Sequence, residues 1–253
     1  MRDFARVLAV CWGAATLLAM PAVAADRYDQ PWTRDDSVLV LDPYEANEID
    51  WDKLARDPKV VGLIHRATIG LKADSRYGER AHEAQARGYL WGAYHLGRAG
   101  DPIAQADFFL KTVGNAEGVL LALDLEDVTD ANNMNIADAI RFIAHVKART
   151  GRAPVVYANR TVTFALSFDS EFAAIAPGTR LWYARYKDHF SPTDLGAWRD
   201  YFLWQFSSEE NCKTDGACLY NVPGVHHDMD VNVYPGSREA LAAAWSSPLA
   251  EGK

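Results

Sequence analysis

The sequence predicts an α/β barrel, and three observations lead to this prediction. Short apolar runs rich in β-branched residues recur along the chain, as strands do. Helix-like stretches separate the earlier runs, and this alternation is typical of parallel strands. The 253 residues suit one large domain, and no linker rich in Pro, Gly or Ser divides them. We expect eight strands, at residues 38–41, 60–69, 90–96, 119–125, 154–157, 180–186, 201–206 and 225–233.

Three helices are expected between the earlier strands. Residues 79–87 are rich in Ala, Glu, Gln and Arg, and Gly88 follows them as a typical helix end. Residues 103–113 carry apolar side chains at helical spacing. Residues 135–149 place isoleucines and a valine on one face, and Gly151 follows. After the fifth strand the helical intervals become short, so the last three connections should depart from a regular barrel.

Residues 1–24 predict a signal peptide. Two arginines precede the almost wholly apolar residues 7–20, and the Ala-Val-Ala at 22–24 is the small-x-small pattern of a cleavage site. The alternative is a retained membrane anchor, but this stretch is shorter than the roughly 20 residues that span a bilayer. We therefore expect cleavage before Ala25, a single domain at residues 25–253, and a periplasmic or secreted location.

The charge balance and the cysteines limit the possible partners and cofactors. A formal net charge of −8 argues against binding to nucleic acid and to anionic membranes. We expect no stable membrane association after cleavage, and a monomer. Cys212 and Cys218 should form a disulfide in an oxidising compartment, the alternative being two free thiols. No Cys/His spacing typical of zinc occurs, so we predict no metal and no cofactor.

Carboxylates lie in or directly after three of the predicted strands. The fourth strand ends in Asp124-x-Glu126, and alternation along a strand turns both side chains to the same side. Mutual repulsion raises the pKa of one such group, which can then act as a general acid. Asp42 ends the first strand and Asp230 lies in the last. In a barrel these ends meet on the face where barrel enzymes carry out their chemistry.

Such a group of acids suits metal binding or glycoside hydrolysis. A magnesium site would call for phosphate-handling basic groups or a Gly-rich loop, and neither motif occurs. Glycosidases combine paired carboxylates with aromatic rings that stack on sugars. Each aromatic residue alone is more often part of a core than of a ligand site. As a set, however, five that lie on predicted strands near this face favour sugar binding: Tyr94, Tyr157, Trp182, Tyr186 and Trp204.

A series of short motifs runs in order from about residue 37 to residue 235. They are Asp42, Ile49-Asp50-Trp51, Arg66-Ala67-Thr68-Ile69-Gly70, Asp74 before Gly88, Gly92-Ala93-Tyr94-His95-Leu96, Gln105-Ala106 with Phe108, Asp124 with Glu126, Tyr157, Leu181-Trp182-Tyr183-Ala184-Arg185-Tyr186, Trp204-Gln205-Phe206-Ser207 and Asp230 with Asn232. Each motif is weak alone, but their shared order is specific. In this order the chain resembles glycoside hydrolase family 25, the N-acetylmuramidase type of lysozyme.

The resemblance implies a fold, an activity and a set of roles. The fold is an irregular TIM-like α/β barrel of five β/α units followed by three strands. The activity is hydrolysis of the β-1,4 bond between N-acetylmuramic acid and N-acetylglucosamine in peptidoglycan. Glu126 matches the general acid, and Asp124 would assist by orienting the N-acetyl group or stabilising the charged sugar. Asp42 and Asp230 would position the sugar, and Asp74 matches a substrate-binding position.

Two departures from the family pattern bear on the substrate. Ile69 replaces an acid of the family, so one polar contact to the substrate is lost. Pro43 follows Asp42 and stiffens the first loop. Two alternatives therefore stand beside the muramidase. One is a weakly active or noncatalytic wall-binding protein on the same barrel, because a fold alone does not imply activity. The other is a hydrolase of another N-acetylhexosamine polymer.

Overall fold

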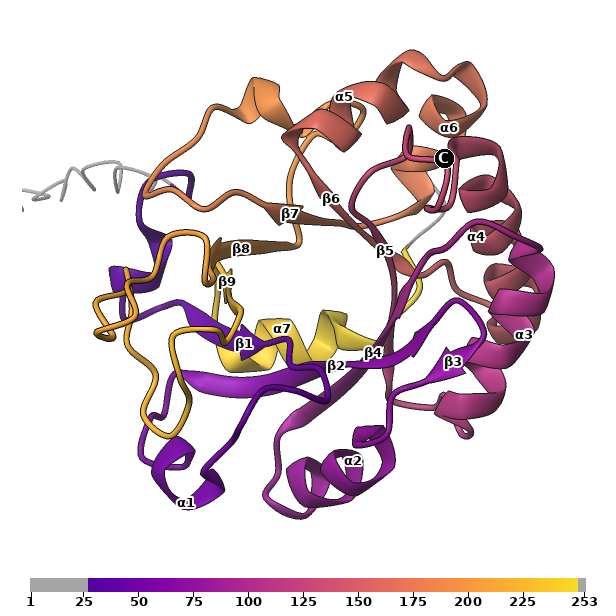
Figure 1. The fold of residues 1–253 in the computed structure, drawn as a ribbon. Coiled ribbons are helices and arrows are strands. Elements are labelled where there is room, and N and C mark those ends of the chain that lie inside the picture. The colour runs from indigo at the N-terminus through magenta and orange to yellow at the C-terminus, as the bar shows by residue number, and fades with distance from the viewer. Residues whose placement is uncertain (1–26, 250–253) are drawn as a thin grey trace, which may run out of the picture.

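The computed structural model describes residues 27–249, which fold into a closed barrel (Figure 1). Within these residues eight strands form the barrel, and β3 adds a short hairpin to β2. The strands are β1 (Val38–Leu41), β2 (Val60–Ile69), β3 (Lys72–Ala73), β4 (Leu90–Leu96), β5 (Leu120–Leu125), β6 (Val155–Asn159), β7 (Leu181–Ala184), β8 (Leu203–Ser207) and β9 (Val231–Tyr234). The ring closes because β1 pairs with both β2 and β9.

The last strand runs against the others. The pairs from β1 through β2, β4, β5, β6 and β7 to β8 are all parallel, whereas β9 is antiparallel to both β8 and β1. The start of β9 therefore lies at the carboxyl ends of its neighbours. This reversal makes the barrel irregular.

Helices follow the first five barrel strands in turn. They are α1 (Trp51–Leu54), α2 (Tyr77–Ala86), α3 (Pro102–Val113), α4 (Ile136–Thr150), and the pair α5 (Arg160–Phe168) and α6 (Ser170–Ile175) after β6. The strands β7, β8 and β9 then follow without an α-helix between them, and α7 (Arg238–Trp245) comes last. The predicted barrel of five β/α units and three further strands is confirmed.

Two buried layers hold the barrel together, and alternation along each strand separates them. In β1, Leu39 and Leu41 belong to the layer that also contains Phe109 of α3 and Phe142 of α4, so it lies between strands and helices. Val38 and Val40 belong to a second layer, inside the barrel.

The final helix closes the amino-terminal end of the barrel. Trp245 of α7 belongs to the inner layer, and its indole N–H donates to the backbone oxygen of Trp91, at 2.7 Å. A Cβ built on Gly62, near the start of β2, would lie 3.3 Å from the same indole. In Figure 1 this helix is seen through the ring of strands. The opposite end, where the parallel strands finish, is left for the connecting loops.

Several predicted bounds are corrected by the structure. The last strand covers Val231–Tyr234 rather than 225–233, because residues 225–230 form a turned connection. β7 ends at Ala184, so Tyr186 lies beyond it. The hairpin strand β3 and the helices α1, α5, α6 and α7 were not predicted, since they are too short to show a clear period. The predicted signal peptide at residues 1–24 lies outside the described residues.

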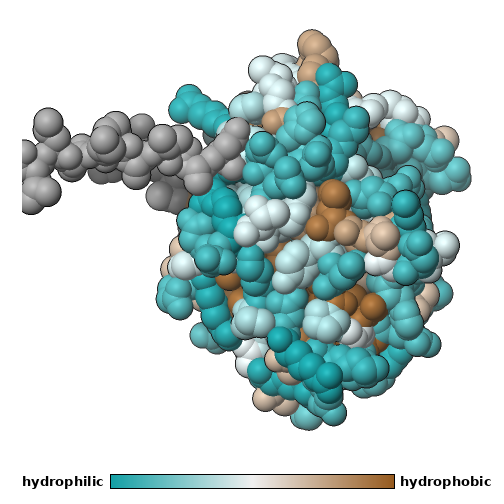
Figure 2. All heavy atoms as spheres, turned by 90° about the vertical axis from the view of Figure 1, so that its left-hand side faces the viewer, coloured by the Kyte–Doolittle hydropathy of each residue, from teal (hydrophilic) through white to brown (hydrophobic). Residues whose placement is uncertain are grey.

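The surface contains small apolar patches among polar side chains. Figure 2 shows the face that carries the connection between β8 and β9, and hydrophilic side chains cover most of it. In the part of the chain that is described, no helix is both long and apolar enough to cross a membrane.

Candidate active site

Four acids lie at the carboxyl end of the parallel strands. Asp42 directly follows β1, Asp124 is the penultimate residue of β5, and Glu126 comes just after that strand. Asp230 reaches the same end for a different reason, because it precedes the antiparallel β9. The backbone N–H of Asp42 donates to the backbone oxygen of Asp230, at 3.2 Å. The structure thus brings the predicted acids to one end of the barrel.

Two side-chain amides hold the buried carboxylate of Asp42. Gln205 of β8 donates from Nε2 to Oδ2, at 2.7 Å, and Asn232 of β9 donates from Nδ2 to Oδ1. Asn232 also donates to the backbone oxygen of Val40, at 2.9 Å. Both oxygens of Asp42 are therefore satisfied by uncharged donors, which lets a carboxyl group stay buried without a cation beside it.

Aromatic side chains fix the orientation of these two amides. Tyr157 and Tyr186 both donate from their hydroxyls to Oε1 of Gln205, at 2.8 and 2.7 Å. The indole N–H of Trp182 donates to Oδ1 of Asn232. Because each amide oxygen accepts from an aromatic donor, each amide nitrogen must face Asp42. These three aromatic residues therefore lie beside the acids and act on them through the amides.

The electrostatics of the site favour protonated carboxyl groups. Burial, and then the charge of Asp230, raise the pKa of Asp42 well above its ordinary value. Burial, and then the charges of Glu126 and Asp230, raise that of Asp124 in the same way. Burial, followed by the charge of Glu209 and other nearby carboxylates, raises the pKa of Asp230 to about 8. The site thus concentrates acids that retain protons where free carboxylates would lose them.

Asp124 and Glu126 differ in their access to solvent. Asp124 is 8% exposed, and its Oδ1 is buried with no hydrogen-bond partner among the described residues. Glu126 is exposed, and its backbone oxygen accepts from the side-chain amide of Asn159, at 3.0 Å. One acid is therefore buried with an unused acceptor, while its neighbour reaches solvent. Two carboxyl groups in such different environments can take different chemical roles in one reaction.

Arginines moderate the negative charge of the site. The positive charges of Arg98, just after β4, and Arg66 of β2 lower the pKa of Asp124 against the larger raising effects. Arg66 also lies over the ring of Tyr44, with its guanidinium carbon 4.7 Å from the ring centroid. Tyr44 is 37% exposed, so the contact with this cation holds an aromatic ring at the surface. Neither arginine, nor Tyr44, was predicted from the sequence.

The expectation that Asp74 contacts the substrate is corrected. Its side chain is fully buried, and both oxygens are occupied. Oδ2 accepts from Nε of Arg66 and from the backbone N–H of Glu45, at 3.1 and 2.9 Å, and Oδ1 accepts from the backbone N–H of Arg76, at 3.0 Å. Asp74 therefore holds Arg66 and the neighbouring loops in place, with no free oxygen for a ligand.

The aromatic residues predicted to bind sugar lie on two different sides of the barrel strands. Tyr94 and Trp182 belong to the inner layer, with ring centroids 6.2 Å apart. Trp204 was predicted to bind sugar, and this is wrong, because it is 0% exposed in the outer layer and packs against Trp32 and Phe190. Its indole N–H donates to the backbone oxygen of Arg185, just after β7, at 2.7 Å. Trp204 is therefore a core residue.

The alternation of side chains along β8 predicts both that Trp204 faces away from the acids and that Gln205 faces them. Trp204 faces outward, so Gln205, the next residue, must face inward. An inward glutamine in an otherwise apolar strand signals a buried hydrogen-bonding partner. The same reasoning applies to Asn232 between the valines of β9. Both residues stood inside recognised motifs, but no role was predicted for them.

The predicted disulfide between Cys212 and Cys218 is present in the connection between β8 and β9. Its Cα atoms are 4.4 Å apart, and the hydroxyl of Ser207, the last residue of β8, lies 3.2 Å from Sγ of Cys212. The crosslink therefore ties the start of this long connection close to the strand that carries Gln205.

Comparison with known proteins now places this barrel among relatives. Residues 42–215 match the family model of glycosyl hydrolases family 25. The fold is similar to that of a bacterial lysozyme from Streptomyces coelicolor, with 24% identity, a TM-score of 0.65, and coverage of 84% of this chain and 99% of that chain. A muramidase from Acremonium alcalophilum is 22% identical, also with a TM-score of 0.65, and coverage is 83% and 99%.

A lysozyme of family GH25 from Aspergillus fumigatus is 20% identical, with a TM-score of 0.65 and coverage of 83% of this chain and 100% of that chain. At these identities the solved structures establish the fold alone. No curated protein matches the chain. The family model, however, covers well over half of the sequence and includes three of the four acids. This chain therefore belongs to glycosyl hydrolases family 25 and is a glycoside hydrolase.

Proposed function

We propose that this glycoside hydrolase is an exported muramidase, which cuts the β-1,4 bond between N-acetylmuramic acid and N-acetylglucosamine in peptidoglycan. The observation that carries the proposal is the pairing of exposed Glu126 with buried Asp124, beside Asp42 and Asp230. The solved structures with the same fold include lysozymes and muramidases, which supports this choice of polymer.

In this proposal Glu126 is the general acid. Its carboxyl group gives a proton to the glycosidic oxygen as the bond from that oxygen to the sugar carbon breaks. As that bond breaks, either an enzyme carboxylate or the acetamido oxygen of the substrate bonds to the sugar carbon. A water molecule then displaces this oxygen from the sugar carbon, and the proton of the water returns to the Glu126 carboxylate. Glu126 suits this role because it is exposed at the carboxyl end of the strands, directly after the strand that carries buried Asp124.

Asp124 would orient the sugar rather than exchange protons with solvent. Its buried Oδ1 has no partner within the described structure, so it offers an acceptor to an acetamido N–H of the substrate. A raised pKa does not remove this capacity, because a protonated carboxyl group keeps a carbonyl oxygen. The intermediate is an enzyme ester or an oxazoline formed by the substrate, and these residues are compatible with either.

Export is the second part of the proposal. The predicted signal peptide at residues 1–24 supports it, and so does the disulfide, because such crosslinks persist in oxidising compartments. N-terminal sequencing of the exported protein should begin at Ala25. A mature protein that still begins at Met1 would contradict export by cleavage.

Analysis of reducing ends tests the activity directly. Purified peptidoglycan is digested, the products are reduced, and the sugar at each new end is identified. We expect new ends at N-acetylmuramic acid with the wild type and none above background with Glu126→Gln. Chitin oligomers form the second arm. Cleavage of chitin alone would identify a hydrolase of another N-acetylhexosamine polymer, and binding to sacculi without release would identify a noncatalytic wall protein.

A further inference from the structure

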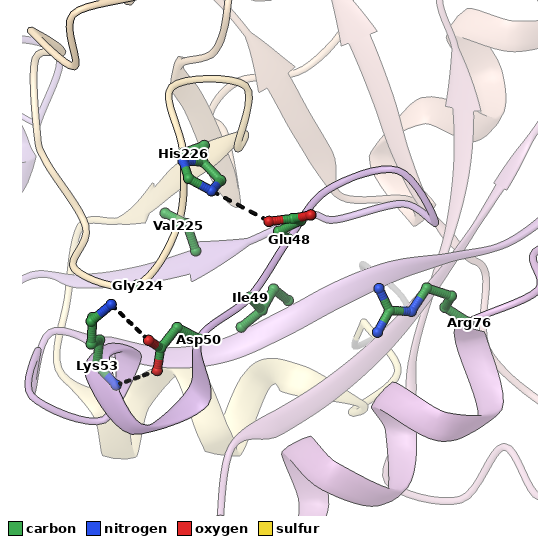
Figure 3. A pocket seen from close by; sticks show the side chains of 8 residues that line it. All are labelled: Glu48, Ile49, Asp50, Lys53, Arg76, Gly224, Val225 and His226. Atoms are coloured by element: carbon green, nitrogen blue, oxygen red, sulfur yellow. Dashed lines mark hydrogen bonds and ion pairs between the residues drawn. The ribbon is translucent and has the colours of Figure 1, made fainter.

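A charged pocket lies at the edge of the end of the barrel that carries the acids. It has a volume of about 530 Å³ and lies where the connection from β1 to α1, the start of α2 and the connection from β8 to β9 meet (Figure 3). Its lining consists of Glu48, Ile49, Asp50, Lys53, Arg76, Gly224, Val225 and His226. Apart from the backbone N–H of Arg76, which donates to Asp74, none of these residues takes part in the contacts described above.

Contacts between two loops fix the position of this pocket. One loop leaves Asp42, and the other leads into Asp230. The backbone N–H of Asp50 donates to the backbone oxygen of Gly224, at 2.7 Å, and the side chain of Asn47 donates to the backbone oxygen of Asp228, at 3.0 Å. The pocket therefore lies outward from Asp42 and Asp230 along the loops that carry them.

Gly224 makes the contact between the loops possible. It adopts φ +85°, a conformation that favours glycine, and a Cβ at this position would lie 2.4 Å from the backbone oxygen of Asp50. Any larger residue would push the loops apart. The local sequence thus keeps the two walls of the pocket in contact.

The lining combines side chains of both charges with two apolar side chains. Lys53 pairs with Asp50, at 2.8 Å, and His226 lies 3.5 Å from Glu48. Arg76 pairs with Glu79 outside the pocket, at 3.3 Å. Figure 3 shows the Arg76 side chain extending toward Ile49, which with Val225 supplies the apolar part.

These features suit a ligand that is itself zwitterionic, with short apolar groups between its charges. Most of the lining residues carry charged or polar side chains, so a polar ligand is favoured over an apolar partner. The stem peptide of peptidoglycan has this chemistry, because it combines several carboxylates, a side-chain amine and alanine methyl groups. It is also attached to the N-acetylmuramic acid that would occupy the catalytic site.

We propose that this pocket binds the stem peptide of the substrate, with Arg76 and Lys53 facing its carboxylates and Glu48 and Asp50 facing its amine. The inference rests on the proposed muramidase function, since the peptide is attached to the sugar that a muramidase binds. The pocket then determines a preference for glycan strands that carry peptides over bare strands.

The test compares two substrates from one peptidoglycan preparation, intact sacculi strands and strands from which an amidase has removed the peptides. For the wild type, Arg76→Ala and Lys53→Ala, kcat/KM is measured on both. An exposed ion pair contributes up to about 1 kcal/mol, so each variant should lower the ratio of peptide-bearing to bare kcat/KM about two- to fivefold. The loss should appear in KM.

Arg141→Ala is the matched control. Arg141 lies on the surface of α4 and pairs with Asp138 three residues before it, at 3.4 Å, much as Arg76 pairs with a glutamate three residues after it. Its ratio should equal that of the wild type. Cleavage of both substrates with unchanged ratios in Arg76→Ala and Lys53→Ala would contradict the pocket assignment alone. Failure of the wild type to release reducing ends from either substrate would contradict the muramidase function, and this inference with it.

Discussion

The side-chain amide of Gln205 donates a hydrogen bond to Oδ2 of Asp42, at 2.7 Å. The donor lies in β8 and the acceptor follows β1, so the bond links two strands that do not pair with each other but both pair with β9. Oε1 of the same amide accepts from two tyrosine hydroxyls, Tyr157 and Tyr186. A buried network stabilises the fold when every polar group in it has a hydrogen-bond partner. Removing one donor leaves a buried acceptor without a partner, and this destabilises the protein.

Gln205→Glu should destabilise the protein in a way that depends on pH. The substitution replaces a donor that faces Asp42 with a carboxylate oxygen, and it adds a charge to a buried acidic group. We expect a loss of about 1–3 kcal/mol at neutral pH and partial recovery in acid, where the new group is protonated. Thermal melting at several pH values measures this. Gln85→Glu, on the exposed face of α2, is the control. Equal melting temperatures in the two variants would contradict the network.

Glu126→Gln should remove most of the catalytic activity and leave the fold intact. Glutamine keeps the shape of the side chain but cannot donate a proton as a carboxylic acid does. General acid catalysis contributes about 10²–10⁴-fold in rate, so muropeptide release should fall at least that far. Melting temperature shows whether the variant is folded.

Asp127→Asn is the control for this substitution. Asp127 is also exposed, and its Oδ1 accepts from the backbone N–H of Thr129, at 2.8 Å, a contact that asparagine can keep. Release by this variant should stay near the wild-type rate. A folded Glu126→Gln protein with wild-type release would show that another group supplies the proton.

The buried acids of the site should make a contribution to stability that falls as pH rises from about 4 to about 8. In this range the raised pKa of Asp230, about 8 against an ordinary 3.8, means that the folded protein keeps a proton which the unfolded chain has lost. Unfolding then releases a proton, so the free energy of unfolding decreases with pH. The raised pKa values of Asp42 and Asp124 act in the same direction.

Asp230→Asn should therefore flatten this dependence on pH. Urea unfolding midpoints at pH 5 and pH 8 measure the difference, and Asp215→Asn, in the exposed disulfide loop, should leave the slope unchanged. A slope in Asp230→Asn equal to that of the wild type would mean that Asp230 does not hold its proton in the folded state.

Substitutions of Trp182 and Trp204, which are both buried, should separate stability from activity. Trp182→Phe removes the N–H donor that holds Asn232, so turnover and melting temperature should both decrease. Trp204→Phe changes only the outer layer, so we expect a lower melting temperature, by a loss of about 1–3 kcal/mol, with kcat/KM unchanged in the folded protein. A large loss of kcat/KM in Trp204→Phe would restore a role for that ring at the site.

Protein exported natively should carry the disulfide between Cys212 and Cys218. Its mass without reductant should be lower by two hydrogen atoms than after reduction. The closed loop is short, so replacing both cysteines with serine should cost about 2 kcal/mol or less. Two thiols that react with an alkylating reagent before reduction would contradict this prediction.

Local pattern was enough to predict much of the barrel. Alternation and apolar runs located the eight strands, and the helix predicted at residues 135–149 is α4 at Ile136–Thr150. Its ends are determined locally, since the Asn135 side chain accepts from the N–H of Asp138 and Gly151 has φ 77°. The four acids were found in the same way, because carboxylates at the ends of apolar strands are visible in the sequence.

The contacts around those acids depend on closure of the barrel. The sequence by itself determined that Asp42 follows the first apolar strand and that Asp230 belongs to the last strand region. Only the tertiary structure decided that β9 runs antiparallel and brings Asn232 to Asp42, across 190 residues of chain. It also decided that Asp74 pairs with Arg66, and that Trp204 packs in the layer between the strands and the helices. Local sequence sets the spacing of side chains along a strand, whereas the direction of a strand and the partners across the barrel depend on hydrogen bonds between distant segments.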